Sequence, residues 1–233
     1  MKHSEKHGHY HPLTRIIRHS VNIFSEMGFE VDYGPEIETE ENNFDNLNMP
    51  PDHPARDMQD TFWIKNDPSR LLRTQTSAHQ VPYMQSHTPP FRMVSYGKVF
   101  RNEATDKTHN AQFHQLEGVA VDTKGEVTLA HLKGSLFKYI EEMFGNVEKR
   151  LRPGYFPFVE PGVEVDIYSK NKWLEVLGGG MVHPTVLENA NLDPQKYSGF
   201  AFGIGIDRIA MIKYGIEDIR HLYSGDLRFI NQF

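Results

Sequence analysis

The sequence predicts an α+β fold, in which a mostly antiparallel sheet is flanked by helices. Short runs of β-branched and aromatic residues alternate with segments rich in Gly, Pro, Asn and Asp, which is typical of strands separated by turns. Many of these runs are joined by loops too short for a crossover helix, so antiparallel pairing is favoured. A few longer segments show the apolar spacing of helices, and these are expected to pack against the sheet.

The first helix is expected over 13–27, where apolar residues recur at helical spacing and Gly28 follows as a stop. The next run, 29–37, alternates as a strand does but is interrupted at Gly34-Pro35, which indicates a bend or an edge. A long polar loop is expected over 42–60. Loops of that length inside a domain are usually functional or packed at an interface.

The remaining elements follow from the same two patterns. Further strands are expected at 61–64, 91–100, 113–121, 163–168, 173–177 and 199–206. Further helices are expected at 77–86, 128–144 and 205–214.

Composition places the 233-residue chain among ordinary globular proteins, with 38% hydrophobic and 24% charged residues. No apolar run approaches the ~20 residues that span a bilayer, so no membrane segment or signal peptide is expected. The chain has no cysteine, which rules out disulfides and thiolate zinc sites and fits a reducing compartment, by default the cytoplasm. A net charge of −6 argues against nucleic-acid binding through bulk charge, so any RNA contact must be local or shared with a partner.

The domain organisation is expected to be simple. No Gly, Ser or Pro-rich linker divides the chain and no repeat recurs, so residues 11–233 are predicted to form one domain. The first twenty residues hold five histidines. They could bind a transition metal, but a mobile, histidine-rich terminus over residues 1–10 is the preferred interpretation.

Two segments each present one arginine at the end of an aromatic-rich, strand-like run, Arg101 in 98–103 and Arg208 in 199–208. A guanidinium group is always charged and can bind phosphate oxygens bidentately. Two such groups on rigid elements suit a triphosphate, and this indicates nucleotide-dependent activation. Phe113, at the start of the strand that returns from Arg101, could offer a flat face to a base. An exposed hairpin with a surface pair of Arg101 and Glu103 explains the same residues without a ligand.

The glycine-rich run around Gly203 and Gly205 does not complete a dinucleotide-binding motif, because Arg208 stands where the third glycine is needed. The sequence there favours a strand that runs directly into a helix beginning near Gly205. Arg208 would then lie on the first helical turn, where the helix-end potential adds to its own charge.

Acidic strands lie between these two segments. If 163–168 and 173–177 pair as a hairpin around 169–171, Asp166 and Glu175 could face one pocket and hold Mg²⁺. Solvated strand carboxylates are the alternative. Gln115 and Glu117 alternate after Phe113 and therefore share one face, where an amide and a carboxylate together suit an ammonium group.

The chain resembles the catalytic module of class II aminoacyl-tRNA synthetases, and most closely the α subunits of bacterial phenylalanyl-tRNA synthetases, from about residue 11 to residue 233. The strings that carry the resemblance are His11-Pro-Leu-Thr14, Gly34-Pro-Glu-Ile-Glu38, His53-Pro-Ala-Arg-Asp-Met-Gln-Asp-Thr-Phe62, Leu72-Arg-Thr-Gln-Thr-Ser77, Phe113-His-Gln-Leu-Glu-Gly118, Tyr155-Phe-Pro-Phe-Val-Glu-Pro161, Gly180-Met-Val-His-Pro184 and 199–208. The resemblance implies the class II catalytic fold, with the first helix and the strand broken at Pro35 as a subunit interface.

The resemblance also implies the nucleotide site. Arg101 would bind the α-phosphate and the substrate carboxylate, Phe113 would stack on adenine, and Arg208 would cover the other adenine face and reach the γ-phosphate. The other residues implied in ATP binding are Glu103, His109, Glu175 and Gly205. Magnesium would be held by carboxylates from the set Glu160, Asp166 and Glu175.

For the amino acid, the resemblance implies that Ser77, Gln115 and Glu117 hold the ammonium group. Phe156 and Phe158 would meet an aromatic side chain edge to face, whereas without the resemblance they would be interpreted as two core phenylalanines. The pocket would be completed by Val159, Ala201 and Gly203.

The implied reaction is activation of phenylalanine with ATP and Mg²⁺, followed by transfer to tRNA(Phe), in an α2β2 assembly with a β subunit. Family members carry an N-terminal helical arm that contacts tRNA, whereas this sequence begins almost at the catalytic module. Two alternatives remain open: a paralogue that activates an amino acid for a non-tRNA acceptor, and a non-catalytic regulatory module with the synthetase fold.

Overall fold

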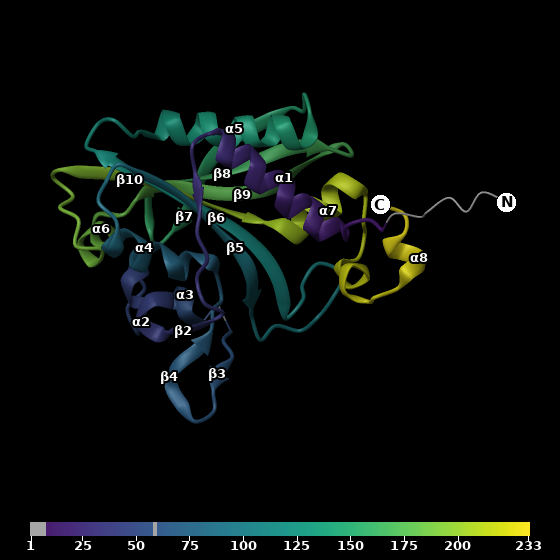
Figure 1. Cartoon of the computed structure of the whole chain (residues 1–233), viewed down its shortest axis with the longest axis horizontal. Coiled ribbons are helices and arrows are strands. Elements are labelled where there is room, and N and C mark those ends of the chain that lie inside the picture. Colours follow the sequence, from purple (N-terminus) through teal and green to yellow (C-terminus); the bar gives the residue numbers. More distant parts are fainter. Residues whose placement is uncertain (1–7, 58–59) are drawn as a thin grey trace.

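The computed structural model describes residues 8–57 and 60–233. At its centre is a seven-stranded sheet, and a three-stranded sheet lies beside it (Figure 1). The large sheet has the order β1 (Glu30–Val31), β5 (Phe91–Phe100), β6 (Gln112–Thr123), β10 (Tyr197–Gly205), β9 (Lys172–Val182), β8 (Val159–Ser169) and β7 (Lys149–Phe156). The small sheet has the order β2 (Ile37–Thr39), β4 (Asp67–Leu72) and β3 (Trp63–Ile64). All neighbours pair antiparallel except β1 and β5. The predicted α+β class is therefore confirmed.

Three helices cover one face of the large sheet, namely α1 (Pro12–Glu26), α5 (Leu129–Phe144) and α7 (Ile206–Tyr214) (Figure 1). Their apolar sides meet the sheet in the larger core, where the ring of Phe24 stacks on Tyr139 at 5.1 Å and on Phe202 at 4.7 Å. Soon after α1 ends, the chain turns at Gly28, whose φ of 82° lies in the left-handed region that favours glycine. The helices predicted at 13–27, 128–144 and 205–214 therefore form where their apolar spacing indicated.

The opposite face of the sheet is covered by shorter elements, which form a second layer and enclose a second core. They are η2 (Thr76–His79), α4 (Gln80–Ser86) and α6 (Pro184–Asn189), together with α2 (Glu40–Asn43), η1 (Asp45–Leu47) and α3 (Pro54–Asp57). The chain ends in η3 (Ile219–Tyr223) and α8 (Leu227–Ile230). The long polar loop expected over 42–60 is thus only partly present, because α2, η1 and α3 lie within it or overlap its start. The polar side chains of this segment bind one another, and its backbone forms short helices instead of a solvated loop.

Two strands escaped prediction for local reasons. β4 contains Pro68 and β7 contains Pro153, and a proline within a run argues against a strand except at an edge. β7 is indeed the edge strand of the large sheet. The single strand expected over 29–37 is two strands, because Gly34-Pro35 separates β1 from β2 and the two join different sheets.

The predicted hairpin around 169–171 forms, with β8 and β9 joined through Lys170 and Asn171. Both turn residues have positive φ, 50° and 61°, as the tightest two-residue hairpin turns require. In this register Asp166 lies directly opposite Glu175.

The histidine-rich terminus expected over residues 1–10 lies mostly outside the described residues. In the part that is described, His9 Nε2 lies 3.1 Å from the Ile230 carbonyl oxygen, and the Arg18 guanidinium lies 4.6 Å from the centre of the Tyr10 ring. Among residues 8–57 and 60–233, none of the helices has the length and apolarity to cross a membrane.

A buried hydrogen bond between α1 and α5 offers a test of this core. Ser20 Oγ and Tyr139 Oη lie 3.0 Å apart. Tyr139→Phe is expected to lower the free energy of unfolding by about 1–3 kcal/mol, because it leaves the Ser20 hydroxyl buried with its partner removed. Adding Ser20→Ala should recover part of that loss in urea unfolding. A double variant as unstable as the sum of the two single variants would contradict the pairing.

Candidate functional site

A cavity of about 820 Å³ lies where β6, β9 and β10 meet the second layer. Its walls include both arginines singled out from the sequence, Arg101 and Arg208, although 107 residues separate them in the chain. The other sequence-predicted residues that line it are Ser77, Gln115, Glu117, Phe156, Phe158, Glu175, Ala201, Gly203 and Gly205. The fold therefore gathers most of the candidate residues around one space.

Arg101 follows the last residue of β5 and is held on both its backbone and its side chain. Its N–H donates to the Ala111 carbonyl at 3.0 Å, and Nε donates to the Thr74 carbonyl at 3.2 Å. The guanidinium carbon lies 5.2 Å from the centre of the Phe113 ring. Burial lowers the pKa of Arg101, whereas the nearby Glu103 and Glu117 carboxylates act in the opposite direction. The structure thus presents a partly desolvated, oriented cation to the cavity.

Arg208 reaches the cavity from the first turn of α7, which begins directly after β10. The start of this helix is tied to β6 by the buried carboxylate of Asp207. That carboxylate accepts hydrogen bonds from the His114 N–H at 2.7 Å and from the Tyr223 hydroxyl at 2.5 Å. Arg208 itself stays exposed. A second cation is therefore fixed at its helix while its head remains available to a ligand.

Glu117 provides the negative end of the cavity. It is buried on β6, and its carboxylate accepts hydrogen bonds from Ser77 Oγ and from Gln80 Nε2, the latter at 3.4 Å. Beside it, Gln115 Oε1 accepts from the Thr76 N–H at 3.3 Å. Burial raises the pKa of Glu117, and the hydrogen bonds and the charge of Arg101 oppose that rise. A desolvated carboxylate of this kind is well suited to a small cation such as an ammonium group.

Aromatic rings form a further wall. Phe156 and Phe158 lie with ring centroids 6.0 Å apart and planes inclined by 24°. A Cβ added to Gly178 would lie 2.6 Å from Phe156 Cζ, so the ring occupies the space that this glycine leaves open. Asn48 Nδ2 donates to the Pro157 carbonyl at 2.7 Å, which ties the turn between the two rings to the second layer.

Several predicted site residues lie away from the cavity wall. Phe113 lies beneath Arg101, and Val159 is buried in the second core beside the aromatic wall. Glu103 and His109 belong to the loop between β5 and β6, where His109 Nδ1 lies 3.0 Å from an Asp106 carboxylate oxygen. None of these four residues lines the cavity.

The three carboxylates proposed for a metal do not come together. Asp166 is buried and already ion-paired, because Arg150 Nε lies 2.9 Å and Arg152 Nε 3.1 Å from the same carboxylate oxygen. Arg152 also contacts Glu164 and binds Glu175, the latter at 2.9 Å. The Glu160 side chain is 78% exposed and lies near His183 instead. Within the part of the chain that the structure describes, no three His, Asp or Glu side chains are grouped to hold a metal. Only Glu175 of the proposed set lines the cavity.

Sequence reasoning missed some lining residues. Gln75, Gln80, the 53–55 segment and Tyr155 all line the cavity. Across its rim, the Tyr155 hydroxyl lies 3.5 Å from His53 Nε2. Gln75 and Tyr155 stood within strings that carry the family resemblance, which was the available signal. Their orientation toward the cavity depends on how the second layer packs.

Comparison with known proteins gives a consistent result. The sequence profile of the tRNA synthetases class II core domain (F) matches residues 1–233. A phenylalanine–tRNA ligase alpha subunit of Acaryochloris marina is 52% identical over 226 residues, which are 97% of this chain and 67% of the relative. One of Proteus mirabilis is 50% identical over 230 residues, covering 98% and 69%. A solved structure of pyrrolysyl-tRNA synthetase from Desulfitobacterium hafniense shares the fold, with a TM-score of 0.75 at 19% identity, covering 96% of this chain and 76% of that one.

The buried Glu117 predicts a pH dependence of stability. Since burial raises its pKa, the folded protein binds the proton more tightly than the unfolded chain. The contribution of Glu117 to stability is therefore lost as the pH rises above the ordinary value of 4.5. The stability of Glu117→Gln relative to the unmodified protein should increase between acidic and neutral pH, as measured by urea unfolding across a pH series. Glu141→Gln, on the exposed side of α5, serves as the control. A Glu117→Gln difference that does not change with pH would contradict the argument.

Proposed function

Because the chain belongs to the class II tRNA synthetase core family, among the phenylalanine–tRNA ligase α subunits, we propose that it activates phenylalanine with ATP and transfers it to tRNA(Phe). One observation carries the proposal for this chain. A single cavity is lined by two arginines, Arg101 and Arg208, by the buried carboxylate of Glu117 and by the rings of Phe156 and Phe158. This arrangement matches a nucleotide joined to an aromatic amino acid.

In the first step, a carboxylate oxygen of phenylalanine attacks the α-phosphorus of ATP. The new oxygen–phosphorus bond forms phenylalanyl-adenylate, and the bond to the β-phosphate oxygen breaks to release pyrophosphate. Arg101 would bind the α-phosphate and the attacking carboxylate, and Arg208 would bind the γ-phosphate. Since a carboxylate is already a nucleophile at neutral pH, no general base is needed. Alignment and charge stabilisation supply the catalysis.

In the second step, a terminal ribose hydroxyl of tRNA attacks the activated carbonyl, and AMP leaves. The amino acid would be oriented for both steps at its ammonium and its ring. Glu117, with Ser77 and Gln115, would hold the ammonium group, while Phe156 and Phe158 would contact the phenyl ring. Aromatic pairs contribute about 0.5–1.5 kcal/mol beyond the area they bury. Ala201 and Gly203 would line the remaining space, with Val159 behind them.

Magnesium would be the metal that accompanies ATP, where it neutralises phosphate charge. The donor set supports a minimal protein contribution, because Mg²⁺ usually takes one or two carboxylates and completes its shell with water and phosphate. Of the proposed set only Glu175 lines the cavity, and its half-exposed carboxylate, which also pairs with Arg152, would supply one such oxygen. Asp166 and Glu160 do not fit, because neither lines the cavity.

The partners follow from the family. We propose that the chain works with a β subunit, that the assembly is α2β2, and that it acts in the cytoplasm. The chain spans about two thirds of the two relatives compared here, 67% and 69%, and segments present in them would contribute to tRNA binding. No observation favours the paralogue with a non-tRNA acceptor or the regulatory module.

The proposed function is tested by ATP–pyrophosphate exchange in the presence of each amino acid, with and without the β subunit. Exchange is expected with phenylalanine. Arg101→Ala should reduce its rate by about 10²–10³, as loss of one charge-stabilising donor typically does. Exchange with another amino acid and never with phenylalanine would overturn the assignment.

The aromatic wall yields a second test. Gly178→Ala places a methyl group 2.6 Å from Phe156 Cζ and should push that ring toward the amino acid. Overpacking of this kind typically costs about 1–3 kcal/mol, so KM for phenylalanine should rise about tenfold while KM for ATP stays unchanged. Gly134→Ala on α5, where an added Cβ meets no atom within 4 Å, is the matched control. Equal KM values for phenylalanine in the two variants would show that Gly178 does not shape the pocket.

A further inference from the structure

We propose that Asn43 is a positioning residue, which holds Arg101 in its phosphate-binding orientation through Thr74. The inference rests on the proposed function. Asn43 is the last residue of α2, is fully buried and does not line the cavity. Asn43 can therefore influence the cavity only through a residue that lines it, here Arg101.

Asn43 makes two hydrogen bonds to Thr74. Its Oδ1 accepts a hydrogen bond from the Thr74 N–H at 3.1 Å, and its Nδ2 donates to Thr74 Oγ1 at 2.9 Å. A planar amide that makes both bonds to one residue holds the backbone N–H and the side chain of that residue in place. The Thr74 carbonyl is the group that accepts from Arg101 Nε at 3.2 Å. Asn43 thus holds the residue that carries this acceptor.

Neighbouring contacts hold the same segment against β5. Arg73 Nε donates to the Lys98 carbonyl at 2.8 Å, and the Phe100 N–H donates to the Arg73 carbonyl at 2.9 Å. Arg73 thereby fixes the segment to the strand that ends just before Arg101, and Asn43 fixes it to the second layer. With Nε bound to Thr74, a ligand in the cavity would meet the two terminal nitrogens of Arg101, which is the fork that binds phosphate and carboxylate.

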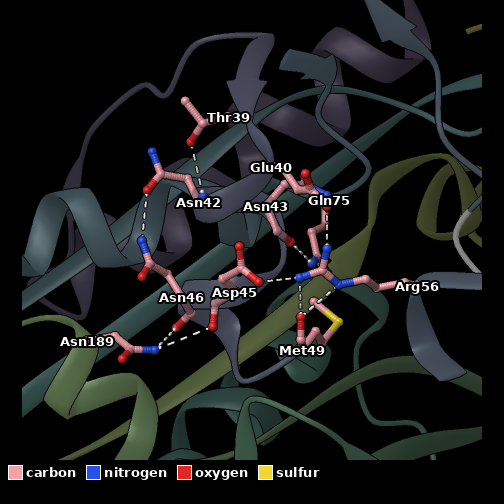
Figure 2. A network of polar contacts seen from close by, with 10 residues as sticks. All are labelled: Thr39, Glu40, Asn42, Asn43, Asp45, Asn46, Met49, Arg56, Gln75 and Asn189. Atoms are coloured by element: carbon pink, nitrogen blue, oxygen red, sulfur yellow. Dashed lines mark hydrogen bonds and ion pairs between the residues drawn. The ribbon is translucent and has the colours of Figure 1, made fainter. Parts of the chain in front are cut away.

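The polar network in Figure 2 holds the segment that contains Asn43. Arg56 contacts Glu40 and Asp45 through its terminal nitrogens, at 2.6 Å for Glu40, and its Nε donates to the Met49 carbonyl at 2.8 Å. Thr39 Oγ1 caps α2 by accepting from the Asn42 N–H at 3.2 Å. These contacts hold the chain on both sides of Asn43. The Asn43 backbone carbonyl itself accepts a hydrogen bond from Gln75 Nε2 at 3.2 Å. A network outside the cavity therefore stabilises an arginine inside it.

A double-mutant cycle tests the inference, with ATP affinity measured by calorimetry and exchange measured with the β subunit present. Asn43→Ala is expected to weaken ATP binding about tenfold and to slow exchange, as the loss of coupled hydrogen bonds typically does. In an Arg101→Lys background the same change should have little further effect, because lysine lacks the Nε and the fork through which Asn43 acts. Additive losses in the two backgrounds would overturn the proposal, since a merely structural role lowers both equally.

Asn46→Ala is the matched control. Asn46 belongs to the same network, but its side chain donates to Asn42 Oδ1 at 3.0 Å (Figure 2), so ATP affinity should change by less than about twofold. If Asn43→Ala does not fold, Thr74→Val removes one of the two contacts and should give a smaller loss in the same direction, again absent with Arg101→Lys.

The two proposals fail in different ways. Absence of phenylalanine-dependent exchange in the unmodified complex would refute the proposed function, while the ATP-binding cycle would still report the coupling of Asn43 to Arg101. Unmodified protein that does not bind ATP at all would refute both.

Discussion

The placement of opposite charges at the edge of a core is the constraint on which the rest of this structure depends. Glu117 lies buried on β6, and Arg101 lies partly buried just after the end of the adjacent β5. Charges removed from water are costly unless polar groups surround them. The fold meets this requirement with short-range donors and acceptors, Ser77 and Gln80 for the carboxylate and Thr74 for the guanidinium.

The second layer supplies those groups, and this accounts for its unusual construction from short polar helices. Asn43 fixes Thr74, and Asn48 binds the carbonyl between the two aromatic rings of the cavity. The same segment, 40–57, therefore supports both the cationic end and the aromatic end of the site. Arg56 closes the segment on itself, with its guanidinium 4.8 Å from the centre of the Phe44 ring. The contacts that hold the site in this way lie within the protein and need no ligand, as alignment of two substrates requires.

Much of the fold could be predicted because the informative pattern was local. The apolar spacing of α1 and α5 and the alternation of β5 and β6 report directly which side chains face the core. Local patterns failed where distant contacts decide the structure. The polar residues of 42–60 look like solvated loop until Arg56 and Asn43 find partners, and β7 contains a proline that only an edge strand tolerates.

The sequence by itself determined the fold class, the family and the identity of the two arginines, because strand alternation, helical spacing and the run of family motifs are all written along the chain. Tertiary structure alone decided that Arg101 and Arg208 share one cavity, since strand order brings β5, β6 and β10 together. Tertiary structure also decided which of the carboxylates proposed for a metal reaches the cavity. Asp166 and Glu175 pair in register as expected, yet Arg150 and Arg152 of the edge strand β7 bind Asp166, and of the three carboxylates proposed for a metal only Glu175 lines the cavity. Such ion pairs depend on which strand lies beside the carboxylates.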